Sequence, residues 1–152
     1  MQHLDKNTLF SIFEADDEEV YKEHELTDLL DNPYVLMGMV VKGLRNFEII
    51  DIMYTRSYKD EYLSIRHNVK HRYYTKLVSY LDRIQDESFD AIYSVGDSYD
   101  ADDVMDSMRE LLTHFEYKED YSKCSTIIKY HELIAGVIIN RELSVNLIKD
   151  SH

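Results

Sequence analysis

The chain has 152 residues, of which 44% are apolar, with one cysteine and no run of about 18 apolar residues that could span a membrane. This length suffices for one domain with a buried core, so residues 1–152 are expected to form a single domain. The first ten residues lack the charged-then-apolar pattern of a secretory leader. Cys124 has no cysteine to pair with, which fits a reducing compartment, and we expect a cytoplasmic protein.

The charge is large and unevenly distributed. The whole chain carries a net charge of −13, yet residues 54–76, here called the basic segment, hold six Lys or Arg against two acidic residues. The acidic remainder is expected to attract basic partners and repel nucleic acid, whereas the basic segment could do the opposite. Few Pro, Gly, Ala and Arg beside 13 Tyr indicate an AT-rich genome, as in many phages, although a cellular gene shows the same composition.

The first third of the chain predicts two helices. Asp16 and Glu19 have the spacing of a capping box, which predicts a helix through Val20 and Leu29. Asn32 followed by Pro33 is a strong helix start, and the apolar residues after it predict a second helix as far as Leu44.

Residues 46–69 are ambiguous. They could extend this second helix, or residues 48–56 and 61–69 could pair as a β-hairpin, since Ile, Tyr and Thr favour strands. A helix followed by such a hairpin near 47–69 would give an α+β fold of winged-helix type. This arrangement is the alternative fold.

The rest of the chain predicts three amphipathic helices, near 61–85, 101–116 and 120–140, with Asp100 as a cap for the second. Their apolar residues recur near every 3.6 positions, and Pro and Gly are too scarce for many turns. We therefore predict a mainly α fold, a compact domain of five or six helices.

Two histidines, His67 and His71, are four residues apart and would share one face of a helix, as metal ligands do. They lie nearly opposite the apolar stripe, so we expect them to face solvent. A third ligand, either Glu61 or His114, would be available only if folding brought it close. Without a zinc motif or a glycine-rich phosphate loop, the sequence predicts no metal, no cofactor and no enzyme.

The basic segment is a candidate nucleic-acid site. Its cations would neutralise phosphates and its tyrosines would stack on bases. The residues assigned to this site are Arg56, Arg66, Lys70, Arg72 and Tyr74. The opposing interpretation is that these cations pair with carboxylates of the chain itself, and that Tyr62 and Tyr73 belong to the core.

The acidic surface is the leading candidate for partner binding. Carboxylates recur along one side of the predicted helix 101–116, about 6 Å apart, and could imitate a row of phosphates. These residues, here called the acidic ridge, are Asp102, Asp103, Asp106 and Glu110, and a second acidic run contains Asp16, Asp17, Glu18 and Glu19. An ordinary solvated helix face would show the same pattern.

These patterns favour a small acidic regulator that docks on a basic surface of a target protein, such as a host nucleic-acid-binding protein, and inhibits or redirects it. Nucleic-acid mimicry by a phage-encoded inhibitor in the host cytoplasm is the sharpest form of this hypothesis. Two alternatives stay open. One is a nucleic-acid-binding accessory protein acting through the basic segment, and the other is a helical assembly subunit that forms a homo-oligomer.

Overall fold

The computed structural model describes residues 4–5, 7–9, 32–84 and 101–150, and the regular structure among them is helical. The four long helices are α3 (Pro33–Tyr58), α4 (Asp60–Asp82), α6 (Ala101–Tyr117) and α7 (Tyr121–Asp150). The predicted mainly helical class is confirmed. The predicted helix after Asp16 and the cap at Asp100 lie outside the described residues.

Helix α3 begins where the sequence predicts. The side-chain oxygen of Asn32 accepts hydrogen bonds from the backbone N–H groups of Tyr34 (2.8 Å) and Val35 (3.4 Å), and Pro33 occupies the first turn. The side chain thus satisfies two backbone donors that the first turn leaves without helical partners. The helix then continues to Tyr58, well beyond the predicted end at Leu44.

The predicted β-hairpin near 47–69, and with it the winged-helix alternative, is wrong. Helix α3 runs to Tyr58 and α4 begins at Asp60, so only Lys59 separates them. Helical spacing brings Tyr54 onto Tyr58 (ring centroids 5.2 Å apart) and onto Tyr62 (5.8 Å) across the turn. The β-propensity of Ile, Tyr and Thr is therefore overridden by tertiary packing, as happens often with this weak preference.

Helices α3 and α4 are joined by a tight turn without glycine, and so are α6 and α7. Lys59 connects α3 to α4 with φ of 46°, and Glu119 lies between α6 and α7 with φ of 57°. After α6, the N–H of Asp120 donates to the carbonyl of Phe115 (3.0 Å) and the N–H of Glu119 to that of Glu116 (3.0 Å). These two bonds form the Schellman motif that commonly ends a helix with a left-handed residue.

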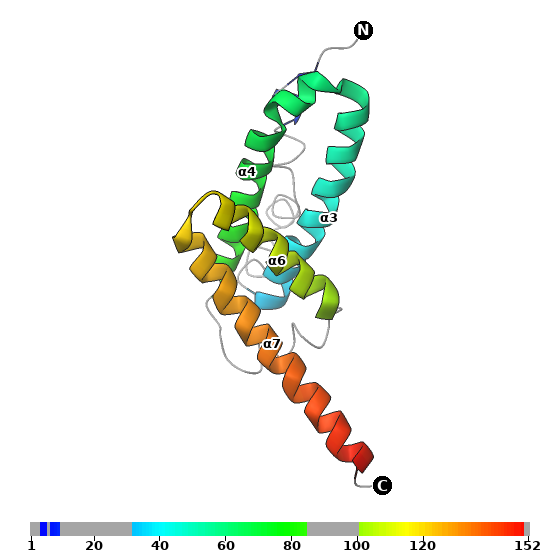
Figure 1. Ribbon diagram of the computed structural model, residues 1–152, viewed down its shortest axis with the longest axis vertical. Helices are drawn as coiled ribbons and strands as arrows, with labels where there is room; N and C mark the ends of the chain where they lie inside the picture. The colour runs from blue at the N-terminus through cyan, green and yellow to red at the C-terminus, as the bar shows by residue number, and fades with distance from the viewer. Residues whose placement is uncertain (1–3, 6, 10–31, 85–100, 151–152) are drawn as a thin grey trace.

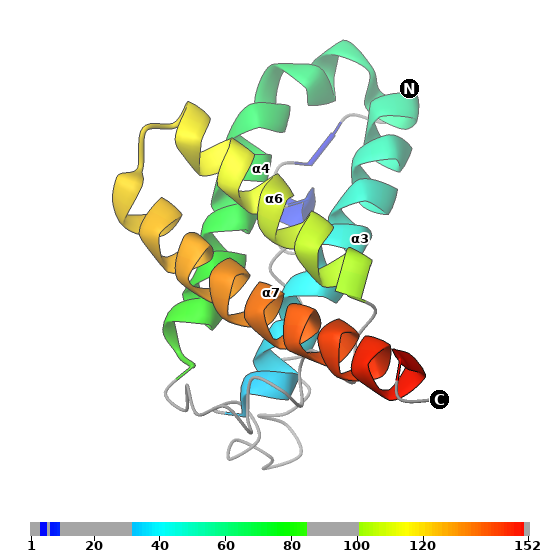
Figure 2. The ribbon, with the colours of Figure 1, turned by 60° about the horizontal axis from the view of Figure 1, so that its bottom comes forward.

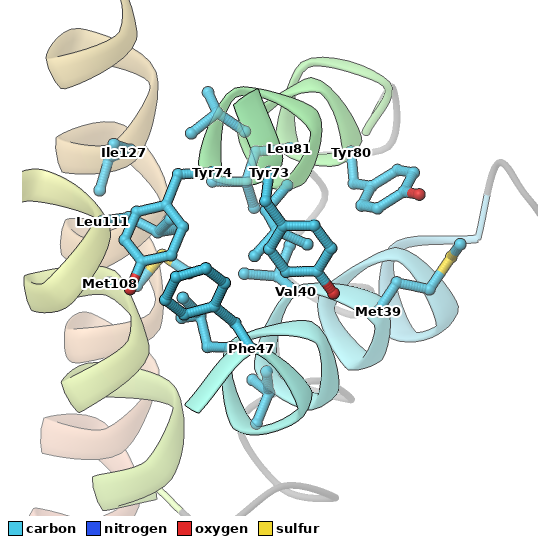
Figure 3. Packing of buried hydrophobic residues seen from close by; sticks show 14 of the residues in the cluster. Met39, Val40, Phe47, Tyr73, Tyr74, Tyr80, Leu81, Met108, Leu111 and Ile127 are labelled. Atoms are coloured by element: carbon cyan, nitrogen blue, oxygen red, sulfur yellow. The ribbon is translucent and has the colours of Figure 1, made fainter. Parts of the chain in front are cut away.

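The two helical hairpins pack across each other, with α6 lying over the α3–α4 pair (Figures 1 and 2). Their core is rich in aromatic residues (Figure 3). Phe47 of α3 stacks on Tyr73 of α4 with centroids 5.8 Å apart and meets Tyr74 edge-on at 5.4 Å. Met108 and Leu111 of α6 close this core from the other hairpin.

Helix α7 extends past the rest of the bundle, and its last turns project beyond α3, α4 and α6 in Figure 1. The predicted helix at 120–140 is therefore confirmed and ten residues longer than expected. None of the described helices combines the length and apolar content needed to cross a membrane.

Candidate functional site

Helix α6 has one buried and one exposed side, as its sequence predicts. Val104, Met108, Leu111 and Phe115 are each no more than 1% exposed. Most of the acidic ridge lies on the opposite side, where Asp102 and Asp106 are exposed, while Asp103 and Glu110 are half-buried at its edge. The second acidic run, Asp16 to Glu19, lies outside the described residues.

Residues of the acidic ridge have partners within the molecule. Asp103 pairs with Arg45 of α3, and Asp106 pairs with Arg109 one turn away (3.0 Å). Glu110 accepts a hydrogen bond from the hydroxyl of the buried Tyr74 at 2.6 Å. Glu110 thus has a structural role, because it satisfies the only donor on the Tyr74 ring.

The exposed surface next to the ridge includes two tyrosines that were not assigned to a binding site from the sequence. Tyr117, at the end of α6, is 77% exposed, and Tyr121, at the start of α7, is 68% exposed. The spacings from Asp102 to Asp106 and on to Tyr117 keep these side chains on one side of the helix. Asp102, Asp106, Glu116 and Tyr117, which are all exposed, are called the α6 outer face below.

Tyr121 belongs to the apolar pattern that predicts the helix at 120–140, and the structure places it at the surface instead of in the core. The buried side of α7 begins at Cys124 and Ile127, and Tyr121 precedes the part of α7 that packs on the bundle. The exposure of Tyr117 could have been predicted from its position, because the apolar stripe of α6 ends two residues earlier, at Phe115. Exposed tyrosines matter because tyrosine is enriched at protein interfaces and among the residues that dominate binding energy.

The basic segment is largely engaged in internal contacts. Arg66 donates two hydrogen bonds to the carboxylate of Asp51, at 2.8 and 2.9 Å, and Lys70 lies 5.3 Å from the ring centroid of Tyr74. Tyr74 is fully buried and cannot stack on a base in this structure. Arg56 and Arg72 are the two residues of this candidate site that are exposed.

The Asp51 carboxylate shows why the basic segment is tied to the bundle. Burial alone would raise the pKa of Asp51, but hydrogen bonds from Arg66 and Tyr62 outweigh it and lower that pKa. The charged carboxylate is therefore favoured, and it holds the end of α3 to the start of α4. Tyr62 and Tyr73 are buried, as the opposing interpretation of this segment expected.

Helix α3 carries a second exposed surface. Ile49, Ile52 and Met53 are 58%, 51% and 58% exposed, and Arg56 lies on the same side one turn further along. We call these four residues the α3 outer face. Residue type alone does not separate them from the core residues of the same helix, because Ile and Met are usually buried.

Histidines from two helices meet on α4. Nδ1 of His71 lies 3.0 Å from Nε2 of His114 on α6, and the rings of His67 and His114 have centroids 6.2 Å apart. His67 is exposed, as predicted, but His71 is half-buried because α6 packs across that side of α4. His114, which the sequence considered only as a distant partner, lies at the centre of this histidine cluster.

The surroundings of the histidine cluster disfavour positive charge. Burial, together with His71, Lys70, His67 and Lys118, lowers the pKa of His114 to about 4. Burial and the nearby Lys118 also lower the pKa of His71. Both imidazoles are therefore neutral at pH 7. Within the described parts of the chain, no group of three or more His, Cys, Asp or Glu is arranged to hold a metal ion.

Comparison with known proteins adds no assignment: no family model, no curated protein and no solved structure matches this chain.

Proposed function

We propose that the chain is a protein-binding regulator that docks on a basic surface of a target protein through the α6 outer face. The observation that supports this proposal is the combination of Asp102, Asp106 and Glu116 with Tyr117, which is 77% exposed. Carboxylates would align a cationic partner and speed its association, while an exposed tyrosine supplies apolar contact area and a hydroxyl.

The proposed activity is inhibition or redirection of the target, and nucleic-acid mimicry is its sharpest form. A nucleic-acid-binding protein is the natural target, because its groove is built to neutralise a row of anions. We place this activity in a reducing cytoplasm, since the single Cys124 is a buried free thiol. A phage gene in an AT-rich host remains part of the hypothesis.

The structure changes which residues should be tested. Reversing Glu110 would leave the hydroxyl of buried Tyr74 without its acceptor, so lost binding could come from a damaged fold. Asp103 is also unsuitable because it pairs with Arg45 of α3. Asp102 and Asp106 are better choices, because both are exposed and Asp106 pairs with Arg109 within its own helix.

The test compares two double variants with equal charge change. In D102K/D106K the reversed charges lie on the α6 outer face, and in E132K/E142K they lie on exposed positions of α7. Both are used to capture partners from the natural host's lysate at two salt concentrations, with and without nuclease. We expect D102K/D106K to lose at least tenfold in capture of a protein partner, with nuclease making no difference, while E132K/E142K keeps it.

Equal capture by the two variants would remove the α6 outer face from consideration. A capture signal that disappears with nuclease would favour the alternative, nucleic-acid binding through Arg56 and Arg72. That alternative is second because Arg66, Lys70 and Tyr74, its other assigned residues, already contact groups within the bundle. The assembly-subunit alternative draws support from the apolar side chains of the α3 outer face.

A further inference from the structure

The His71–His114 contact links two helices through a single pair of ring nitrogens. At 3.0 Å one nitrogen donates and the other accepts, so at least one of the two imidazoles must be neutral. Two protonated rings would bring two N–H donors and two positive charges together. Unlike a contact between a histidine and a carboxylate, this contact cannot survive full protonation.

The groups around His114 leave an added proton uncompensated. The groups that lower the pKa values of the two imidazoles are His67 and Lys70 of α4, Lys118 after α6 and Lys123 of α7. The Asp120 carboxylate favours a charged His71, but as the smallest of the effects on that ring, and Asp120 is itself bound by Lys123 (2.9 Å). Glu110 accepts the hydrogen bond from Tyr74.

Aromatic side chains exclude water from the same place. His114 is 6% exposed and meets the rings of Tyr74 (5.0 Å) and Phe115 (4.9 Å) edge-on. An imidazolium ion in this position would have neither water nor a free carboxylate, and burying a charge in that way is costly.

The histidine cluster adjoins the surface proposed to bind partners. The ring of His67 meets that of Tyr117 edge-on, with centroids 6.1 Å apart, and Tyr117 follows His114 by three residues on α6. Movement of the last turn of α6 away from α4 would therefore displace Tyr117 and change the shape of the α6 outer face.

We propose that His71 and His114 form a proton-sensitive latch, which holds the end of α6 against α4 near neutral pH and releases it in mild acid. The regulatory meaning of the latch rests on the proposed function, because the site it would switch off is the α6 outer face. The opening of the latch itself depends only on the contact between α4 and α6 and not on the proposed function. The latch would restrict partner binding to neutral conditions.

The direction of the pH effect follows from linkage. The pKa of His114 is about 4 with the latch closed, against an ordinary value of 6.5 when the ring is solvated. The closed state is therefore fully favoured above pH 6.5 and loses its advantage as the pH falls toward 4. For this one proton, the equilibrium constant for opening rises about twentyfold between pH 7.0 and pH 5.0.

Amide hydrogen exchange of the full chain tests the latch. Rates at pH 7.0 and 5.0, corrected for intrinsic exchange, are compared between residues 110–118 and the middle of α3. In the wild type we expect exchange in 110–118 to rise about twentyfold relative to α3. His114→Gln, whose neutral amide can still donate and accept, should abolish this rise, whereas the control His131→Gln on α7 should retain it.

Two results would overturn the latch: equal acceleration of all helices at pH 5.0, or a wild-type response in His114→Gln. If His114→Gln does not fold, NMR titration of the wild-type histidines replaces it. A His114 that titrates at or above pH 6.5 contradicts the proposal, and one that titrates well below with a coincident shift of Tyr117 supports it. Hydrogen exchange is measured without a binding partner. The test of the latch therefore stays valid even if the capture experiment rules out docking through the α6 outer face.

Discussion

Tyr74 shows how one side chain can change the interpretation of a whole segment. By sequence it was a stacking platform in a basic surface, but it is fully buried and donates a 2.6 Å hydrogen bond to Glu110. Burial and this bond raise the pKa of Tyr74, so the phenol stays protonated and remains a donor. Tyr74, from the basic segment, and Glu110, from the acidic ridge, thus bind each other and hold α4 to α6.

Two of the glycines within described helices, Gly43 and Gly136, have opposite surroundings. A Cβ on Gly43 would lie 2.6 Å from Cδ2 of Leu77 and 3.1 Å from the hydroxyl of Tyr73, whereas Gly136 has nothing within 4 Å. Leu77 is itself buried at 2% exposure, so it has little room to move. Gly43 therefore allows α3 and α4 to approach closely, and Gly136 has no such role within one chain.

We predict that Gly43→Ala and Gly136→Ala shift stability in opposite directions. Gly136→Ala should raise the free energy of unfolding by about 1 kcal/mol, the gain in helix propensity. Gly43→Ala gains the same propensity but overpacks the core at a cost of about 1–3 kcal/mol, so a net loss is expected. Urea denaturation measures both, and a stabilised Gly43→Ala would show that Leu77 moves aside freely.

At the scale of helices, periodicity predicted where helices lie better than where they end. The start at Asn32 and the helices near 61–85, 101–116 and 120–140 are confirmed. The turn at Lys59 lies between the two predicted strands, but it joins two helices and places a positive φ on a lysine, where the usual sequence signal for such a helix end is glycine. Without a glycine to mark the end of a helix, residues 48–69, which are rich in Ile and Tyr, could equally be assigned to a β-hairpin.

The α6–α7 turn supplies a prediction about these unusual junctions. Glu119 has φ of 57°, a conformation that glycine adopts without the steric cost of a Cβ. Glu119→Gly should therefore raise the free energy of unfolding by about 0.5–1 kcal/mol, and Glu119→Val should lower it. Equal thermal midpoints for the two variants would mean that the turn relaxes without cost.

At the scale of the whole molecule, the net charge is distributed very unevenly along the chain. The described residues contain 15 Lys or Arg and 16 Asp or Glu, so together they are nearly neutral. The remaining residues contain 2 basic and 14 acidic side chains, and therefore nearly all of the net charge of −13. The negative field of the chain thus originates mainly in 10–31 and 85–100.

This distribution predicts how the chain meets a cationic partner. Changing Asp16, Asp17, Glu18 and Glu19 to their amides should lower the association rate with polylysine several-fold at 50 mM salt, and the difference should vanish at 0.5 M. Amides at the exposed Glu132 and Glu142 remove two charges from α7 and serve as the control. A rate difference that persists at high salt would contradict long-range steering.

The contacts between helices could not be predicted from one sequence. Tyr74 and Glu110 are 36 residues apart, His71 and His114 are 43 apart, and Arg45 and Asp103 are 58 apart. Periodicity shows which side of a helix is buried, as it did for Tyr62 and Tyr73, but not which helix covers it. The sequence could therefore locate candidate surfaces by their charge. It could not show that residues of these surfaces contact other residues of the same chain, because those contacts form between distant helices.

The α3 outer face has a consequence for how concentrated solutions of this protein behave. At neutral pH, the mutual repulsion of chains that each carry −13 opposes contact between copies through the exposed Ile49, Ile52 and Met53. That repulsion vanishes near the isoelectric point of about 4.8. We therefore expect concentrated solutions of the protein to self-associate more readily in mild acid than at neutral pH, so experiments at low pH call for dilute samples.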